Sequence, residues 1–234
     1  PHFEHTAQLE CEPWIPPGYL PPTAPSRSGP ILAEPDLALG RFRHTLAEAW
    51  YGDLDPGHTE ERYAGPTAPK SELDRCPEAV EKLYNSRRVL DAGAGSCTLY
   101  GWLLEHGLFE RLTHYMSFGS YNCGMLRLCG ERGTVAFQHD WTSPLPLCKE
   151  CTFDAVMQLE GVHHNGSPEK TLRMLQNFDA ALSCGGWLFV NDMDPEAWVP
   201  VLEQWVDSRG YKFEAVSPSC STQSRPGYIV RKIC

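Results

Sequence analysis

Residues 88–96 read Arg-Val-Leu-Asp-Ala-Gly-Ala-Gly-Ser, and this stretch decides the fold. Its Val-Leu pair predicts the end of a short buried strand, which Asp91 closes. Gly93 and Gly95 permit a tight turn whose backbone can approach a ligand, because neither residue carries a Cβ atom. The apolar periodicity that follows, up to Gly107, predicts a helix. Strand, glycine turn and helix together form the opening unit of a nucleotide-binding α/β sheet.

Strands and helices alternate through the rest of the chain. Further strands are predicted at residues 112–118, 133–140, 153–158, 187–190, 211–216 and 228–233, and helices at 121–132, after Ser167 and after Asp194. This alternation predicts an α/β fold with a doubly wound, mostly parallel seven-stranded sheet and helices on both faces. The last two strands predict an antiparallel addition at the edge, because a long polar segment connects them.

Residues 1–85 are predicted to form an N-terminal arm or lid that packs on the core domain of residues 86–234. Residues 1–35 are rich in proline, which disfavours helix interiors and central strands, so we expect them to be irregular. Helical periodicity follows at 36–51 and 71–84. The apolar side chains of this arm favour a segment that lies on the core rather than a free linker.

The charge of the chain limits its partners. It has 234 residues, a formal net charge of −10 and a pI of about 5.3. An acidic protein disfavours nucleic acid and anionic membranes, whose binding depends on contacts to phosphate, so we expect neither partner. We find no apolar run long enough to cross a bilayer and no N-terminal signal segment. Because the chain starts at Pro1 and not at Met, we expect a processed or excised fragment whose targeting segment could be missing.

The ten cysteines are interpreted as reduced thiols. Several of them, such as Cys97, Cys129 and Cys184, fall inside predicted helices or at strand–helix junctions, as buried apolar residues do. A disulfide framework is more typical of a much smaller secreted chain. We therefore expect a cytoplasmic protein. Cys148 and Cys151 have the spacing of half a zinc site, but no second half follows, and no metal is predicted.

The Asp-x-Gly-x-Gly turn after the first strand resembles the first motif of the class I S-adenosylmethionine (SAM)-dependent methyltransferases. A dinucleotide-binding turn would need a third glycine where Thr98 stands, which disfavours a nicotinamide-dependent oxidoreductase. Residues 153–156 and 183–190 resemble the fourth and fifth strands of the family, and the resemblance covers residues 86–233. It implies SAM as cofactor and transfer of its methyl group to an O, S or N nucleophile of a small molecule. It leaves the oligomeric state open.

The resemblance also implies the residues that bind the cofactor. These are Asp91, Ala92, Gly93, Gly95, Ser120, Tyr121, Asp140, Trp141 and Gln158. In the family the glycine turn holds the amino-acid part of SAM, with Asp91 near its ammonium group. Asp140 is expected to meet the adenine amino group, and Trp141 to pack on the ring. Ser120 is a departure, because the family carries there an acid that accepts hydrogen bonds from both ribose hydroxyls, and a serine cannot replace it.

Glu160, His163 and His164 follow the fourth strand, where the family faces its substrate. One imidazole, oriented by Glu160, can remove a proton from the nucleophile during methyl transfer. The same three residues can instead hold a divalent metal ion, or the histidines can simply pack against their neighbours. The substitution at Ser120 also leaves open a different class of function, a catalytically silent methyltransferase-like module that scaffolds a partner or senses a ligand.

Overall fold

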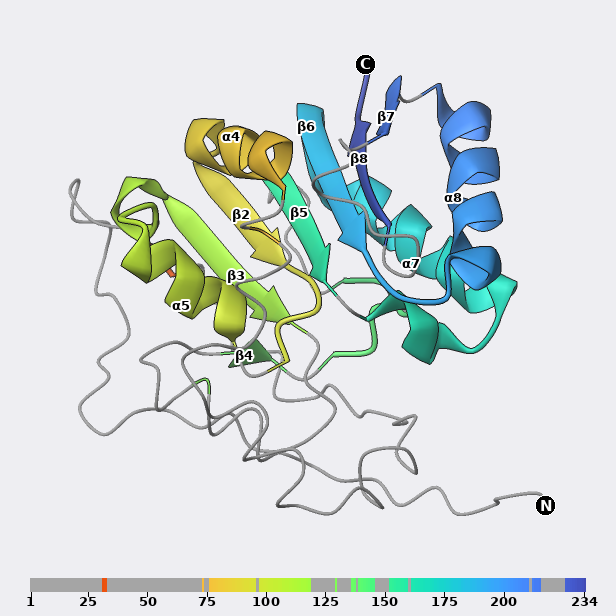
Figure 1. Cartoon of the computed structure of the whole chain (residues 1–234), viewed down its shortest axis with the longest axis horizontal. Helices are drawn as coiled ribbons and strands as arrows, with labels where there is room; N and C mark the ends of the chain where they lie inside the picture. The colour runs from red at the N-terminus through yellow and green to blue at the C-terminus, as the bar shows by residue number, and fades with distance from the viewer. Residues whose placement is uncertain are drawn as a thin grey trace, which may run out of the picture.

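The computed structural model describes residues 31–32, 73, 76–95, 97–118, 129, 136–137, 139–145, 152–159, 161–210, 212–215 and 226–234. In this part of the chain the strands are β1 (Ile31–Leu32), β2 (Arg88–Asp91), β3 (His114–Phe118), β4 (Ala136–Phe137), β5 (Phe153–Leu159), β6 (Leu182–Asn191), β7 (Lys212–Ala215) and β8 (Gly227–Arg231). They form one sheet in the order β1-β3-β2-β5-β6-β8-β7, and β4 also pairs with β3 (Figure 1).

The sheet is parallel except at one edge, as expected. Strands β2, β3, β5 and β6 run in one direction, and β8 pairs antiparallel with both β6 and β7. The predicted fold class is therefore confirmed, but the described strands number eight rather than seven. The additional strand is Ile31–Leu32, which pairs in parallel with His114 and Tyr115 on β3. The proline pattern that predicted an irregular arm missed this strand because it is only two residues long.

In the described part of the chain, the sheet is flanked by the helices α4 (Pro77–Asn85), α5 (Thr98–Glu105), α7 (Pro168–Ala181) and α8 (Pro195–Arg209). Ser167 caps α7, as expected, because its hydroxyl accepts a hydrogen bond from the Lys170 amide at 3.3 Å. Of the helix predicted at 71–84, the structure describes Leu73 as helical and Cys76 as non-helical, and α4 begins at Pro77, since proline fits the first helical position. Two short 3₁₀ turns, η2 (Phe109–Arg111) and η3 (Val162–Asn165), complete the set.

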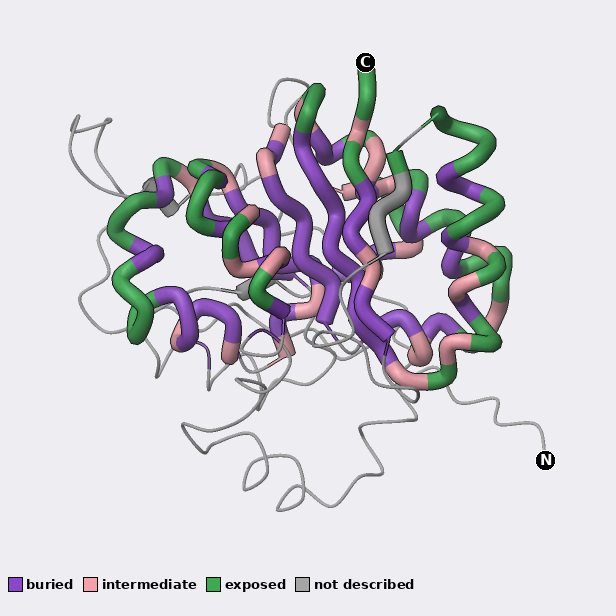
Figure 2. The backbone as a smooth tube through the Cα atoms, turned by 45° about the horizontal axis from the view of Figure 1, so that its top comes forward, coloured by how far each residue is buried: buried purple, intermediate pink, exposed green. Residues whose placement is uncertain are grey.

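Two apolar layers lie on opposite faces of the sheet. Side chains alternate along each strand, so Val89 packs with α4 and α5 in one buried cluster, and its neighbour Leu90 packs with α7 and α8 in the other. The central strands are buried along most of their length (Figure 2). This is the two-faced packing that a doubly wound sheet requires. Because both faces of the sheet are covered by apolar side chains, polar side chains can cluster only at the ends of the strands.

The structure contradicts the prediction of reduced thiols. Cys97 is joined to Cys129 and Cys184 to Cys234, and none of the described cysteines is free. The prediction relied on the burial of these residues, which is equally compatible with paired cysteines. Partners 32 and 50 residues apart cannot be matched from one sequence. Cys148 and Cys151 lie outside the described residues.

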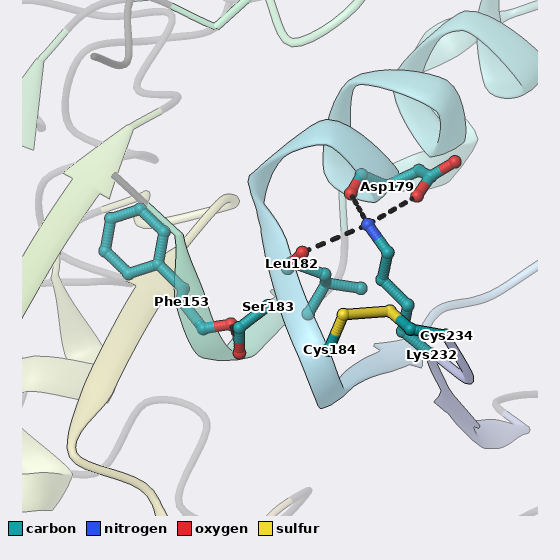
Figure 3. Close-up of a disulfide and its surroundings, with 7 residues drawn as sticks. All are labelled: Phe153, Asp179, Leu182, Ser183, Cys184, Lys232 and Cys234. Atoms are coloured by element: carbon teal, nitrogen blue, oxygen red, sulfur yellow. Dashed lines mark hydrogen bonds and ion pairs between the residues drawn. A yellow bond between two sulfur atoms is a disulfide. The ribbon is translucent and has the colours of Figure 1, made fainter. Parts of the chain in front are cut away.

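The C-terminus is fastened to the start of β6. Cys234 forms its disulfide with Cys184, and beside it Lys232 donates from Nζ to the carbonyl oxygens of Asp179 at 2.8 Å and of Leu182 at 3.1 Å (Figure 3). The Asp179 carboxylate also pairs with Lys232 at 3.0 Å. The Asp179 carbonyl at the end of α7 also accepts a hydrogen bond from the Leu182 amide, so Lys232 adds a second donor there.

Several predictions fall on residues outside the described part. They include most of the arm, the helix at 36–51 and the helix at 121–132, of which only Cys129 is described, in a helical conformation. The domain boundary at residue 86 stays a prediction, although Ala79 and Leu83 of α4 belong to the same buried cluster as the sheet. Among the described residues we find no helix that has both the length and the apolar character needed to span a membrane.

Candidate functional site

Polar side chains follow adjacent strands at one edge of the sheet. Because β2, β5 and β6 are parallel neighbours, Asp91, Gln158 and Asp192 all lie at the carboxyl ends of these strands. Asp91 pairs in register with Met157, and Gln158 pairs with Val190. All three polar side chains are at most 1% exposed. Parallel α/β sheets bind ligands at this edge, so this is the candidate site.

Asp91 is a buried carboxyl at the end of β2. The Tyr115 hydroxyl donates a hydrogen bond to its Oδ2 atom at 2.8 Å. Burial raises the pKa of Asp91 to about 7, although the hydrogen bonds from Tyr115 and from the Gly93 amide act in the opposite direction. A carboxyl kept this far from water is costly to ionise, unless a cation approaches it. It is therefore suited to the ammonium group of a ligand.

Gln158 carries an amide whose nitrogen and oxygen both lack a hydrogen-bond partner within the described structure, although its side chain is fully buried. Two glycines enclose it. A Cβ atom on Gly93 would come within 3.0 Å of Nε2, and one on Gly161 would collide with the same atom. A buried unsatisfied amide is costly and is seldom kept without a partner. The Gln158 amide, enclosed by the glycine turn and Gly161, thus has a donor and an acceptor group that a ligand could satisfy.

Trp141 and Asp140 follow β4, as predicted for the side of the site near the adenine. The Trp141 indole is only 2% exposed and donates from Nε1 to Asn165 at 2.8 Å. One oxygen of Asp140 accepts from the amide of Thr142 at 2.9 Å and from its hydroxyl at 2.7 Å. The structure thus gives Trp141 a packing role beside η3 and fixes the local turn through Asp140. Their predicted contacts with adenine stay predictions.

His163 and Asp192 form a pair at the mouth of the site. The Nδ1 atom of His163 lies 2.6 Å from Oδ1 of Asp192, and the backbone amide of His163 donates to Oδ2 at 3.0 Å. The Asp192 side chain is fully buried, whereas that of His163 is 16% exposed. An ionised carboxylate only accepts, so Nδ1 carries the ring proton and Nε2 keeps its lone pair. This is the arrangement of an oriented general base.

His164 differs from its neighbour. The two rings lie 3.7 Å apart between centroids. Burial and, to a smaller extent, the nearby His163 lower the pKa of His164 to about 4, while Asp192 acts in the opposite direction. An imidazole with so low a pKa is a weak base at neutral pH. Of the two histidines that the sequence singled out, the geometry therefore favours His163.

Three predicted site residues, Ser120, Tyr121 and Glu160, lie outside the described residues. The carboxylate that orients a histidine in the described structure is Asp192, in the role expected of Glu160. The sequence analysis assigned Asp192 no role, and the signal that could have found it is its position directly after a strand at the ligand-binding edge. Among the described side chains we find no group of three or more His, Cys, Asp or Glu that could hold a metal ion. The alternative of a divalent metal site at Glu160, His163 and His164 stays untested, because Glu160 lies outside the described residues.

The chain matches no protein-family model and no curated protein sequence. Solved structures do share its architecture. The sugar N-methyltransferase KedS8 from Streptoalloteichus sp. aligns with a TM-score of 0.58 at 13% identity, over 75% of this chain and 92% of its own. The amino pentose methyltransferase CalS10 from Micromonospora echinaspora, solved with SAM bound, gives 0.56 at 14% identity over 74% and 95%.

The N-methyltransferase NodS from Bradyrhizobium japonicum aligns with a TM-score of 0.52 at 13% identity, over 71% of this chain and 99% of its own. The chain has the class I methyltransferase fold. The methyltransferase fold predicted from the glycine turn and the later strands is thus confirmed. In this fold the edge that carries Asp91, Gln158 and Asp192 is the ligand-binding edge of the sheet.

Proposed function

We propose that this chain is a SAM-dependent methyltransferase that acts on a small molecule with an O, S or N nucleophile. The observation that carries the proposal is the pair of buried polar groups beside the glycine turn, Asp91 and the unpartnered Gln158 amide. Burying such polar groups in an apolar interior costs free energy. A ligand that forms hydrogen bonds or an ion pair with both groups explains their presence.

The residues present fit the amino-acid end of SAM. The Asp91 carboxylate matches an ammonium group, and the amide of Gln158 can both donate and accept. Gly93 lets a ligand approach, since a side chain there would fill the space next to Gln158. Ala92 and Gly95 complete the turn, and the assignments of Ser120, Tyr121, Asp140 and Trp141 rest on the resemblance. When bound, SAM supplies an electrophilic methyl group.

His163 is proposed as the general base. Its Nε2 atom takes the proton that the nucleophile loses, while Asp192 holds the ring in the tautomer that keeps this lone pair available. Asp192 also stabilises the imidazolium that forms. Glu160, which the sequence analysis assigned to this orienting role, is not needed for it. His164 is assigned a packing role next to His163.

A small-molecule acceptor is supported by the structural neighbours, two of which are described as acting on an amino pentose or a sugar. The acidic chain, with a net charge of −10, supports the absence of a nucleic acid partner. The disulfides bear on the compartment. Disulfides form and persist in oxidising compartments, so the two disulfides support folding in such a compartment. The expectation of a cytoplasmic protein rested on reduced thiols and therefore loses its support.

The proposal is tested with labelled methyl groups. The purified protein is incubated with radiolabelled SAM and a panel of amino sugars, phenols, thiols and amines, and label in the product is counted. Transfer to a member of the panel, lost in His163→Ala, supports the proposal. Saturable SAM binding without transfer to any member favours the silent, ligand-sensing module. A folded protein that binds no SAM contradicts the proposed methyltransferase and favours the scaffolding form of the silent module.

A further inference from the structure

A disulfide lies directly at the glycine turn. Cys97 follows Gly95 by two residues and is the N-cap residue of α5. Its partner Cys129 lies in the segment that follows β3, and both are fully buried. The Sγ atom of Cys129 also contacts the carbonyl oxygen of Gly95 at 3.6 Å. The covalent link therefore reaches the backbone that the proposed function assigns to the cofactor.

Two backbone hydrogen bonds hold the start of the same turn. The amide of Ala92 donates to Met157 on β5 at 2.8 Å, and the amide of Ala94 donates to Phe118 on β3 at 3.0 Å. Among the described residues of the turn after Ala94, one further backbone hydrogen bond runs from the Cys97 amide to the Ala94 carbonyl at 2.6 Å. The disulfide adds a covalent tie from Cys97 to Cys129, in the segment beyond β3.

The second half is also the half with unusual backbone geometry. Gly95 and Cys97 have φ angles of +49° and +59°, in the left-handed region. Glycine adopts this region freely, whereas a residue with a Cβ atom pays for it in steric strain. Among the described residues other than glycine, only Cys97 and Asp194 have a positive φ angle. Strain at Cys97 persists because its surroundings hold it, and the disulfide is the strongest of these restraints.

The other disulfide offers a natural comparison. Cys184 lies near the start of β6, at the end of the strand opposite to Asn191 and Asp192, and Cys234 is the last residue of the chain. It closes a loop of similar size, 50 residues against 32. Opening it should affect the stability of the fold but not the glycine turn.

We propose that the Cys97–Cys129 disulfide positions the glycine turn for its ligand, so that SAM binds tightly only to the oxidised protein. The inference rests on the proposed function for the identity of the ligand. Without the link, Gly95 and Cys97 lose this covalent restraint, and the turn must be ordered when the ligand binds. Ordering costs conformational entropy, which appears as lost affinity.

The test compares two double variants, Cys97→Ala/Cys129→Ala and Cys184→Ala/Cys234→Ala. The first should raise the Kd for SAM in calorimetry by about tenfold or more, because ordering even one residue costs roughly this factor. It should also speed hydrogen exchange at the amides of Ala94 and Cys97. The second variant should keep both the wild-type Kd and the wild-type exchange at these amides, whatever its melting temperature.

A glycine variant separates the covalent link from the strain at Cys97. Cys97→Gly/Cys129→Ala removes the disulfide but accepts the φ angle of +59° without cost, so it also serves if the alanine variant does not fold. We expect its turn to exchange faster than in the wild type. Partial reduction of the native protein, with opened thiols alkylated and located by mass spectrometry, gives the same comparison without a substitution.

The hydrogen-exchange readout does not require SAM. If the folded wild type binds no SAM, the proposed function fails, but faster exchange in the opened turn still supports the positioning role of the disulfide. Unchanged exchange at Ala94 and Cys97 after the link is opened overturns that role. Equal SAM affinity of the oxidised and opened forms overturns it as well, since a positioned turn must bind better than a free one.

Discussion

Nδ1 of His163 lies 2.6 Å from Oδ1 of Asp192, and the backbone amide of the same histidine donates to the other oxygen of this carboxylate. The two residues come from neighbouring strand ends, after β5 and after β6. The double contact fixes both the position of the ring and its tautomer. A histidine so held, at the partly exposed mouth of a buried polar site, is the centre of the proposed chemistry.

His163→Ala should reduce methyl transfer by on the order of 10²–10⁴-fold while the Kd for SAM stays unchanged, because only the proton acceptor is lost. Steady-state turnover and calorimetry measure the two quantities. His164→Ala should lose little activity, since its imidazole is a poor base. His106→Ala, directly after the end of α5 that lies away from the glycine turn, is the matched control. Equal losses at His163 and His164 would contradict the assignment.

Asp192→Asn should impair turnover nearly as much as His163→Ala. The asparagine amide can donate to Nδ1 and so favour the tautomer in which Nε2 carries the proton and cannot accept one. The loss should shrink at high pH for an acceptor that ionises unaided, because the base is then redundant. A pH profile of kcat for both variants checks this. A ratio of wild-type to variant kcat that does not change with pH would indicate a purely structural role for Asp192.

SAM affinity should depend on pH through Asp91. Its pKa of about 7 means that the carboxylate, which attracts the ammonium group, is formed above this pH and lost below it. The Kd should therefore rise by up to about tenfold for each pH unit below 7 and level off above it. Calorimetry between pH 5.5 and 8.5 measures the trend. In Asp91→Asn the affinity should be weak and should lose this pH dependence.

The same residue should destabilise the ligand-free protein. The folded-state pKa of Asp91 is raised from 3.8 to about 7, so its favourable contribution is complete below pH 3.8 and is lost as the pH rises through 7. At pH 8 the loss is on the order of 4 kcal/mol. Asp91→Asn should therefore unfold at a higher denaturant concentration than the wild type at pH 8, but not at pH 4. An unchanged midpoint at pH 8 would show that the carboxyl ionises without cost.

Gln158→Leu should likewise increase stability while it weakens SAM binding. Replacing an unsatisfied buried amide by an apolar group of similar size should add about 1–3 kcal/mol to the free energy of unfolding. Gly161→Ala should have the opposite effect, because its Cβ atom collides with the Gln158 amide. The double variant Gly161→Ala/Gln158→Ala should recover part of that loss. Additive effects in this cycle would contradict the contact.

Removing the Cys184–Cys234 disulfide should cost about 2–4 kcal/mol of stability, since the 50-residue loop is then free in the unfolded chain. Chemical unfolding of the Cys184→Ala/Cys234→Ala variant measures the loss. Lys232 still pairs with Asp179 nearby, so the folded C-terminus should stay docked. Hydrogen bonding of β8 to β6 in the folded variant should therefore be retained, which amide chemical shifts of residues 227–231 would show.

Much of the fold was predictable, because it depends on local patterns. The glycine turn after Leu90 and the cap at Ser167 are signals that a few neighbouring residues determine. The alternation of strands and helices then leaves one main topology. The strand at Ile31–Leu32 was missed because two residues carry no periodicity.

The site was predictable only as a set of strand ends. The sequence places Asp91, Gln158 and His163 at the correct edge, but it does not reveal which side chains meet across strands. Asp192 follows a different strand from His163, and the disulfides join segments far apart in the chain. Such contacts depend on register and on side-chain direction, which one sequence does not fix.

Calorimetric titration of the oxidised, folded protein with SAM tests the central claim most directly, with Gly93→Ala as a comparison because its Cβ atom would crowd the Gln158 amide. The account predicts saturable one-site binding to the wild type at pH 8, weaker binding at pH 6, and a loss of affinity in the variant. A wild-type protein that is folded by circular dichroism and takes up no SAM at either pH would contradict it.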